Sequence, residues 1–252
     1  MLKDVMIMRP IVVILLVFMH SFTMFTHGAW TLPDGIHDVP AYNWLTKITF
    51  SFLLETFIFI SGYLLSAQFE RHVSPFLEFA QKKAKRLLLP SVVFSILYFI
   101  LFNQYQGAGR FLLSILEGCG HLWYLPMSFW CFLGGYMLYK MKLPTYAKLM
   151  ACATLACCSG GLGFLPLRLN SAAYYMIFFY LGMVIYENRS KFLNIRPISM
   201  AALCVGYIIS FVVLRPFIEE INSLGETVLK VIVPDSYDPT TAGLPCPARK
   251  SK

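Results

Sequence analysis

Two ionisable side chains lie inside the first apolar stretch of the chain, where such groups usually have a functional role or form a pair with another polar group. Arg9 and His20 are eleven residues apart. In an α-helix this spacing amounts to about 1100°, within about 20° of three full turns, and to about 16 Å along the axis. A cation and an imidazole on one helix face suit a long anionic cofactor. Two other interpretations stay open: Arg9 can extend to the lipid headgroups, and His20 can be a satisfied polar residue near the interface.

A carboxylate, Glu55, lies within the second apolar stretch, six residues before Ser61. In an apolar medium a carboxylate must be protonated or paired. If the first two stretches are antiparallel helices, Glu55 and His20 lie within about two turns of each other in depth. Glu55 can then orient the imidazole and stabilise its charge, and a structural ion pair is the alternative. Ser61 and Gly62 are more typical of a close helix–helix contact than of a nucleophile.

Two further segments contain residues of the kinds that often bind ligands. The basic segment 81–86 contains Lys85 and Arg86. Such a segment anchors a helix to anionic lipid, and it would equally bind the phosphates of a nucleotide-like cofactor. Residues 121–126 have the sequence HLWYLP. An aromatic residue such as Trp123 is ordinary at a membrane interface, whereas His121 beside it is less ordinary.

The composition places these residues in a membrane protein. Of 252 residues 58% are hydrophobic and 13% are charged, and the mean hydropathy is +0.64, whereas about a quarter of a soluble domain is charged. Seven stretches have, or nearly have, the roughly 20 residues that a membrane-spanning helix needs: 6–26, 45–66, 87–105, 122–139, 148–165, 172–186 and 198–214. The sequence therefore predicts an all-α polytopic transmembrane helix bundle with about seven spans.

The positive charge is distributed in short clusters between the apolar stretches, which is typical of cytoplasmic loops and argues against nucleic-acid binding. With the N-terminus inside, the inner segments hold thirteen Lys and Arg residues. The outer loops before the last span hold only Arg110 and Arg168, with Lys47 just inside the second helix. This asymmetry predicts a cytoplasmic N-terminus. The seven Cys form no CxxC pair and the five His no i, i+4 pair, so we expect neither disulfides nor a metal site.

The end of the chain differs from the rest. Residues 1–215 are expected to form one transmembrane domain. Residues 216–252 begin with acidic side chains and a weak apolar patch, and then become polar and rich in proline. Because this segment has no packing pattern, we expect a disordered tail.

Several of these features occur in an order that resembles a known family, the acyltransferase 3 family of membrane O-acyltransferases. The resemblance covers about residues 5–215. It rests on Arg9-x10-His20, on ETFIFISGYL at 55–64, on Lys85-Arg86 followed by Pro90, on HLWYLP at 121–126 and on FFYLG at 178–182.

The resemblance implies transfer of an acyl group, commonly acetyl from acetyl-CoA, to a hydroxyl of a cell-envelope glycan in the bacterial inner membrane. It implies that His20 is the general base on the acceptor hydroxyl and that Glu55 supports it. The residues that would hold the phosphates of coenzyme A are Arg9, Lys85 and Arg86. The residues expected on the substrate side are Ser61, His121 and Trp123. Membrane lipid and the glycan acceptor are the expected partners.

Two alternatives accompany this interpretation. The chain is shorter than is usual in that family and ends in the polar segment, so a C-terminally truncated member, active or inactive, is expected. A transporter or exporter of a sugar or lipid-linked substrate is the alternative from another class. It would favour discontinuous helices and repeat symmetry, and neither is visible in the sequence.

Overall fold

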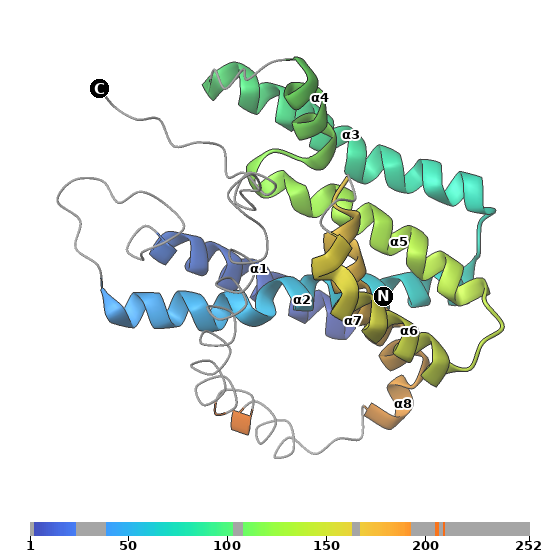
Figure 1. Ribbon diagram of the computed structural model, residues 1–252. Helices are drawn as coiled ribbons and strands as arrows, with labels where there is room; N and C mark the ends of the chain where they lie inside the picture. Colours follow the sequence, from blue (N-terminus) through green and yellow to red (C-terminus); the bar gives the residue numbers. More distant parts are fainter. Residues whose placement is uncertain are drawn as a thin grey trace, which may run out of the picture. The chain divides into compact units, whose positions relative to one another are not determined.

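The computed structural model describes residues 3–23, 39–102, 108–162, 167–192, 205, 206 and 209. The elements assigned among them are all helical: α1 Lys3–Thr23, α2 Pro40–Arg71, α3 Phe76–Phe102, α4 Ala108–Glu117, the 3₁₀ helix η1 Gly120–Trp123, α5 Tyr124–Lys140, α6 Thr145–Cys158, the 3₁₀ helix η2 Ser159–Leu162, α7 Leu169–Glu187 and α8 Arg189–Phe192. For the described residues, the prediction of an all-α chain is confirmed (Figure 1).

Six of the seven predicted spans coincide with helices of the structure. The seventh, 198–214, lies almost wholly outside the described residues, and so does the predicted tail 216–252. By length and composition, three helical segments of the described chain can cross a membrane: Phe52–Arg71, Phe76–Leu101 and Leu169–Glu187. Pro10–Phe22 is a shorter apolar helix. The number of about seven spans stays a prediction.

The chain divides into two compact units, and α1 and α2 contribute residues to both. Of the described residues, the larger unit contains 3–16, 52–102, 108–162 and 167–188, and the smaller unit contains the others. In the smaller unit the end of α1 meets the beginning of α2, where the rings of Phe22 and Tyr42 lie 4.7 Å apart between centroids.

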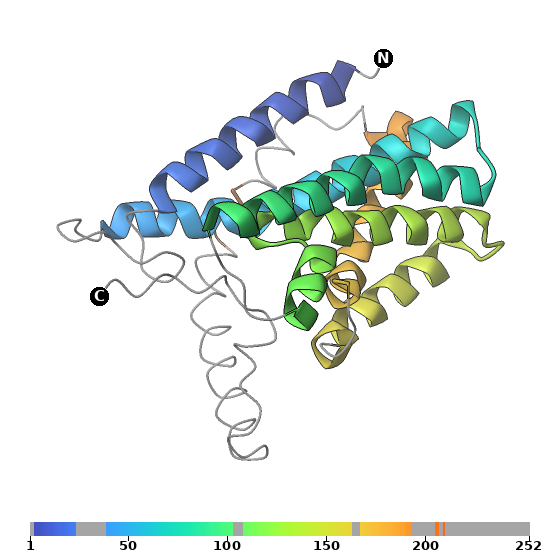
Figure 2. The same ribbon diagram turned by 90° about the horizontal axis from the view of Figure 1, so that it is seen from above.

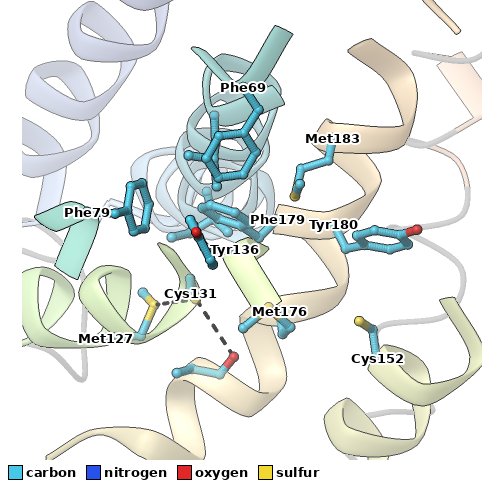
Figure 3. Packing of buried hydrophobic residues seen from close by; sticks show 13 residues of the cluster. Phe69, Phe79, Met127, Cys131, Tyr136, Cys152, Met176, Phe179, Tyr180 and Met183 are labelled. Carbon is cyan, nitrogen blue, oxygen red and sulfur yellow. Dashed lines mark hydrogen bonds between the residues drawn. The ribbon is translucent and has the colours of Figure 1, made fainter. Parts of the chain in front are cut away.

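Helix α7 forms the centre of the larger unit. It packs against α5 and α6, and α3 packs against α5 and α4. Figure 2 shows α3 and α5 running side by side. Phe179 of α7 is completely buried, and the ring of Phe132 in α5 meets it edge-on at 5.2 Å. Cys131 lies in the same core, with its Sγ 3.8 Å from the Sδ of Met127 (Figure 3).

Two glycines allow α2 and α7 to approach each other closely. A Cβ atom at Gly62 would collide with the carbonyl of Phe179. A Cβ atom at Gly182 would lie 2.9 Å from the backbone nitrogen of Tyr63. Membrane helices associate through such small residues because close backbone contact provides the packing energy. The interpretation of Gly62 as part of a close helix–helix contact is therefore confirmed.

Helix α3 begins at Phe76, well before the start of the predicted span at residue 87. The basic segment 81–86 thus lies inside the helix rather than ahead of it. Its Gln, Lys, Ala and Arg residues are strong helix formers. Pro90 falls within the same helix, which membrane helices tolerate because neighbouring groups can satisfy the freed backbone atoms.

Helix α4 has no counterpart among the predicted spans. Its ten residues are too few for a span, and its apolar side chains gather on one face. Ile115 is buried, and the ring of Phe111 lies 5.0 Å from that of Phe99 in α3. A search for continuous apolar stretches passes over such a helix, although an amphipathic periodicity reveals it.

Candidate active site

The carboxylate of Glu55 is incompletely satisfied. Glu55 lies in α2 within the larger unit, its side chain is half-buried, and its Oε2 atom is buried without a hydrogen-bond partner in the described part of the chain. Leaving a buried acceptor unpaired costs about 1–3 kcal/mol, and more for a charged group. Native structures contain few such atoms, and some of those that persist have a catalytic role.

Two tyrosines of α7 interact electrostatically with this carboxylate, and an aromatic residue of η1 lies near one of them. The phenols of Tyr174 and Tyr175 are within electrostatic range of Glu55. The two tyrosine rings meet edge-on with centroids 4.9 Å apart, and Trp123 of η1 lies 6.4 Å from Tyr175. Tyr175 thus connects two residues that the sequence singled out separately, Glu55 and Trp123.

Ser61 belongs to the same region. Its hydroxyl donates a hydrogen bond of 2.9 Å to the carbonyl of Phe57, one turn earlier in α2. The phenol of Tyr124 lies near the hydroxyls of Ser61 and Ser128. We call this group of residues the Glu55 cluster: Glu55, Ser61, Trp123, Tyr124, Tyr174 and Tyr175. Sequence reasoning missed Tyr174 and Tyr175, although this adjacent pair shortly before FFYLG was a visible signal, and it included Tyr124 only as part of HLWYLP, without a role.

Arg9 and His20 both lie in α1, so the helix on which their spacing argument depends is present. The side chain of His20 is half-buried in the last turn of that helix. The side chains of Arg9 and His121 lie outside the described part of the chain. His20 belongs to the smaller unit and Glu55 to the larger one. The pairing of His20 with Glu55 stays a prediction.

The basic segment of α3 presents its side chains in different directions. Lys82 pairs with Glu78, one turn earlier. Lys83 is half-buried, with its Nζ 3.8 Å from the ring centroid of Phe132 in α5. Lys85 and Arg86 are exposed, and neither forms an ion pair with another described residue. These two cations are therefore the ones available to a phosphate or a lipid headgroup.

The sequence profile of the acyltransferase 3 family, described as an acyltransferase domain, matches residues 3–232. The chain therefore belongs to this family, as its motifs suggested. Membership implies acyltransferase activity in general. The family is membrane-associated and the chain has three helices of spanning length, so the chain is a membrane protein. No curated protein and no solved structure gives a significant match.

Proposed function

We propose that this protein transfers an acyl group, in the first instance acetyl, from acyl-CoA to a hydroxyl of a cell-envelope glycan or exopolysaccharide. The observation that carries the proposal is the family match, which includes every residue named for the site. A multi-pass location in the bacterial inner membrane, with about seven spans and a cytoplasmic N-terminus, belongs to the same proposal. The distribution of Lys and Arg supports that orientation.

The thioester of acyl-CoA is already activated, so the protein has to position two substrates and move one proton. In the proposed reaction His20 takes the proton of the acceptor hydroxyl while the hydroxyl oxygen attacks the carbonyl carbon of the thioester. The bond between the carbonyl carbon and sulfur then breaks, and the thiolate leaves and receives the proton from His20. The products are the acyl ester and free coenzyme A. Glu55 stabilises the imidazolium that forms between these steps.

The donor and acceptor sides of the proposed site use different chemistry. Basic residues bind the phosphates of coenzyme A through charge-assisted hydrogen bonds: Arg9, Lys85 and Arg86. The roughly 16 Å between Arg9 and His20 along α1 allows an extended pantetheine arm to reach the base. Polar and aromatic residues contact the acceptor: Ser61, His121 and Trp123. The exposure of Lys85 and Arg86 supports their assignment to the donor.

The test uses the full chain, purified in detergent and supplied with acetyl-CoA labelled in the acetyl group. Release or transfer of the label is compared between the wild type and His20→Ala. The matched control is His72→Ala, because His72 is exposed in the turn after α2. We expect turnover by the wild type and the control and near-complete loss in His20→Ala. Equal rates in all three proteins would exclude His20 as the base, and no turnover by the wild type would contradict the proposed function.

A further inference from the structure

Arg168 has an arrangement that is unfavourable in several ways at once. It is the N-cap residue of α7, with a left-handed φ of 60°. A non-glycine residue there costs about 1–2 kcal/mol, and a cation is disfavoured at the positive end of a helix. In addition, its Nε atom is buried and has no hydrogen-bond partner in the described chain. Local conflicts of this kind concentrate at functional positions.

The backbone around Arg168 is nevertheless well held. The carbonyl of Leu167 accepts a hydrogen bond of 3.0 Å from the indole nitrogen of Trp130 in α5. The carbonyl of Arg168 accepts one of 2.9 Å from the amide of Ala172. The side chain that carries the unsatisfied Nε donor therefore extends from a backbone that is held in place by hydrogen bonds.

Among the described residues, Arg168 forms an ion pair with Glu117, at the end of α4. The Nη2 of Arg168 and the Oε2 of Glu117 are 4.0 Å apart, and both side chains are largely buried, with 25% and 21% exposed. A charge-assisted hydrogen bond is about 2.7–2.9 Å long. The two side chains therefore attract each other electrostatically, but they are too far apart to form a hydrogen bond. The Nε and Nη2 atoms form one edge of the guanidinium, which fits the two oxygens of an oxyanion.

We propose that Arg168 binds an oxyanion carried by the acceptor, a carboxylate or a phosphate ester on the sugar. The assignment to the acceptor rests on the proposed function. Arg168 lies seven residues before Tyr175 on α7, about 10 Å or two helical turns from the Glu55 cluster. It is also one of only two basic residues that the sequence places in the outer loops before the last predicted span, away from the residues assigned to the donor. Glu117 holds the guanidinium in place while the acceptor is absent.

A purely structural ion pair makes a different prediction. In that case removal of either side chain weakens the fold, and the protein does not distinguish an acidic from a neutral sugar. An anion site instead makes Glu117 a competitor of the ligand, since both carry negative charge and approach the same cation. Substitution of Arg168 then weakens the binding of an anionic ligand, whereas substitution of Glu117 strengthens it.

The experiment measures binding of three sugars to the full chain in detergent without acetyl-CoA: D-glucuronate, glucose 6-phosphate and D-glucose. They share a ring and differ at one carbon. We expect the wild type to bind at least one charged sugar about tenfold or more tightly than glucose, a difference typical of one ionic contact. Preference for glucuronate identifies a carboxylate, and preference for the phosphate identifies a phosphate ester.

Two variants complete the test. Arg168→Gln should remove the preference for the charged sugar, and Glu117→Gln should tighten its binding several-fold. Arg168→Lys keeps the charge without the planar edge and should retain part of the preference, which provides a readout if Arg168→Gln does not fold. Equal affinity of the wild type for all three sugars, or an unchanged preference in Arg168→Gln, would overturn the inference. Because no acyl donor is present, this result is independent of whether His20 supports transfer.

Discussion

Helices α3 and α7 are both long and apolar enough to cross a membrane, yet their surroundings differ. Only 11% of the apolar window of α3 is buried inside the protein, against 39% for α7. Ile100 and Leu101 of α3 are 70% and 76% exposed, whereas Phe179 of α7 is completely buried. Hydropathy alone thus indicates a membrane helix, but it does not tell whether lipid or protein surrounds that helix.

The same contrast separates the functional residues. The motifs at 55–64 and 178–182 meet where Gly62 and Gly182 bring α2 and α7 together. The buried Oε2 of Glu55 lies in this packed region. The exposed cations Lys85 and Arg86 lie on α3 instead. We infer that the packed helices α2 and α7 hold Glu55 in place, while the lightly covered helix α3 presents charge for binding.

The largest expected effect on stability comes from truncating a buried side chain at the centre of the larger unit. Phe179→Ala should lower the free energy of unfolding by about 3–5 kcal/mol, because the neighbouring helices cannot fully close the cavity. Ile100→Ala on α3 should change it by less than about 0.5 kcal/mol. Denaturant unfolding in micelles measures both. Similar losses in the two variants would remove the contrast between α7 and α3.

The close approach of α2 and α7 is tested by adding a single methyl group. Gly182→Ala should cost about 1–3 kcal/mol, because the helices must separate to admit the Cβ atom. Gly160→Ala is the control, since nothing lies within 4 Å of a Cβ atom there. Thermal unfolding of both variants in the same detergent provides the comparison, and an unchanged midpoint for Gly182→Ala would contradict the glycine contact.

A smaller effect on stability is expected within the basic segment of α3. Lys83→Met should lower the free energy of unfolding by about 1 kcal/mol through loss of the cation–π contact with Phe132. The KM for acetyl-CoA should stay the same. Lys82→Met is the control at a neighbouring exposed position. A raised KM without loss of stability would instead place Lys83 in the donor site.

The smallest change in stability is expected at the exposed cations, where binding should change instead. Arg86→Ala and Lys85→Ala should leave the unfolding midpoint within experimental error and raise the KM for acetyl-CoA. Arg9→Ala should raise this KM as well, since each contact holds a phosphate of the donor. Steady-state kinetics with acetyl-CoA as the varied substrate provides the measurement. A fall in kcat alone would argue against the donor role.

The sequence predicted the helical class, the approximate position of six helices and the family, because apolar length and short motifs are local properties. It placed Glu55 and Trp123 in the site but gave no sign of Tyr175, a residue of a distant helix that lies near Trp123 and within electrostatic range of Glu55. The Glu117–Arg168 pair joins residues far apart in the chain. In the sequence Lys83 does not differ from its basic neighbours, but in the structure it contacts the ring of Phe132, because α3 packs on α5. Such pairings depend on how helices associate, and apolar membrane helices carry little periodicity that reveals their partners.

We infer that the incompletely hydrogen-bonded carboxylate of Glu55 serves the reaction rather than the fold. The most direct measurement is the rate of acetyl transfer by Glu55→Gln beside its thermal midpoint, both taken on the same purified protein. We predict a loss of about 100-fold or more in kcat, a size typical of general acid–base chemistry, with a midpoint equal to or above that of the wild type, since a poorly satisfied buried group is replaced by a neutral one. Transfer within twofold of the wild-type rate would contradict the claim.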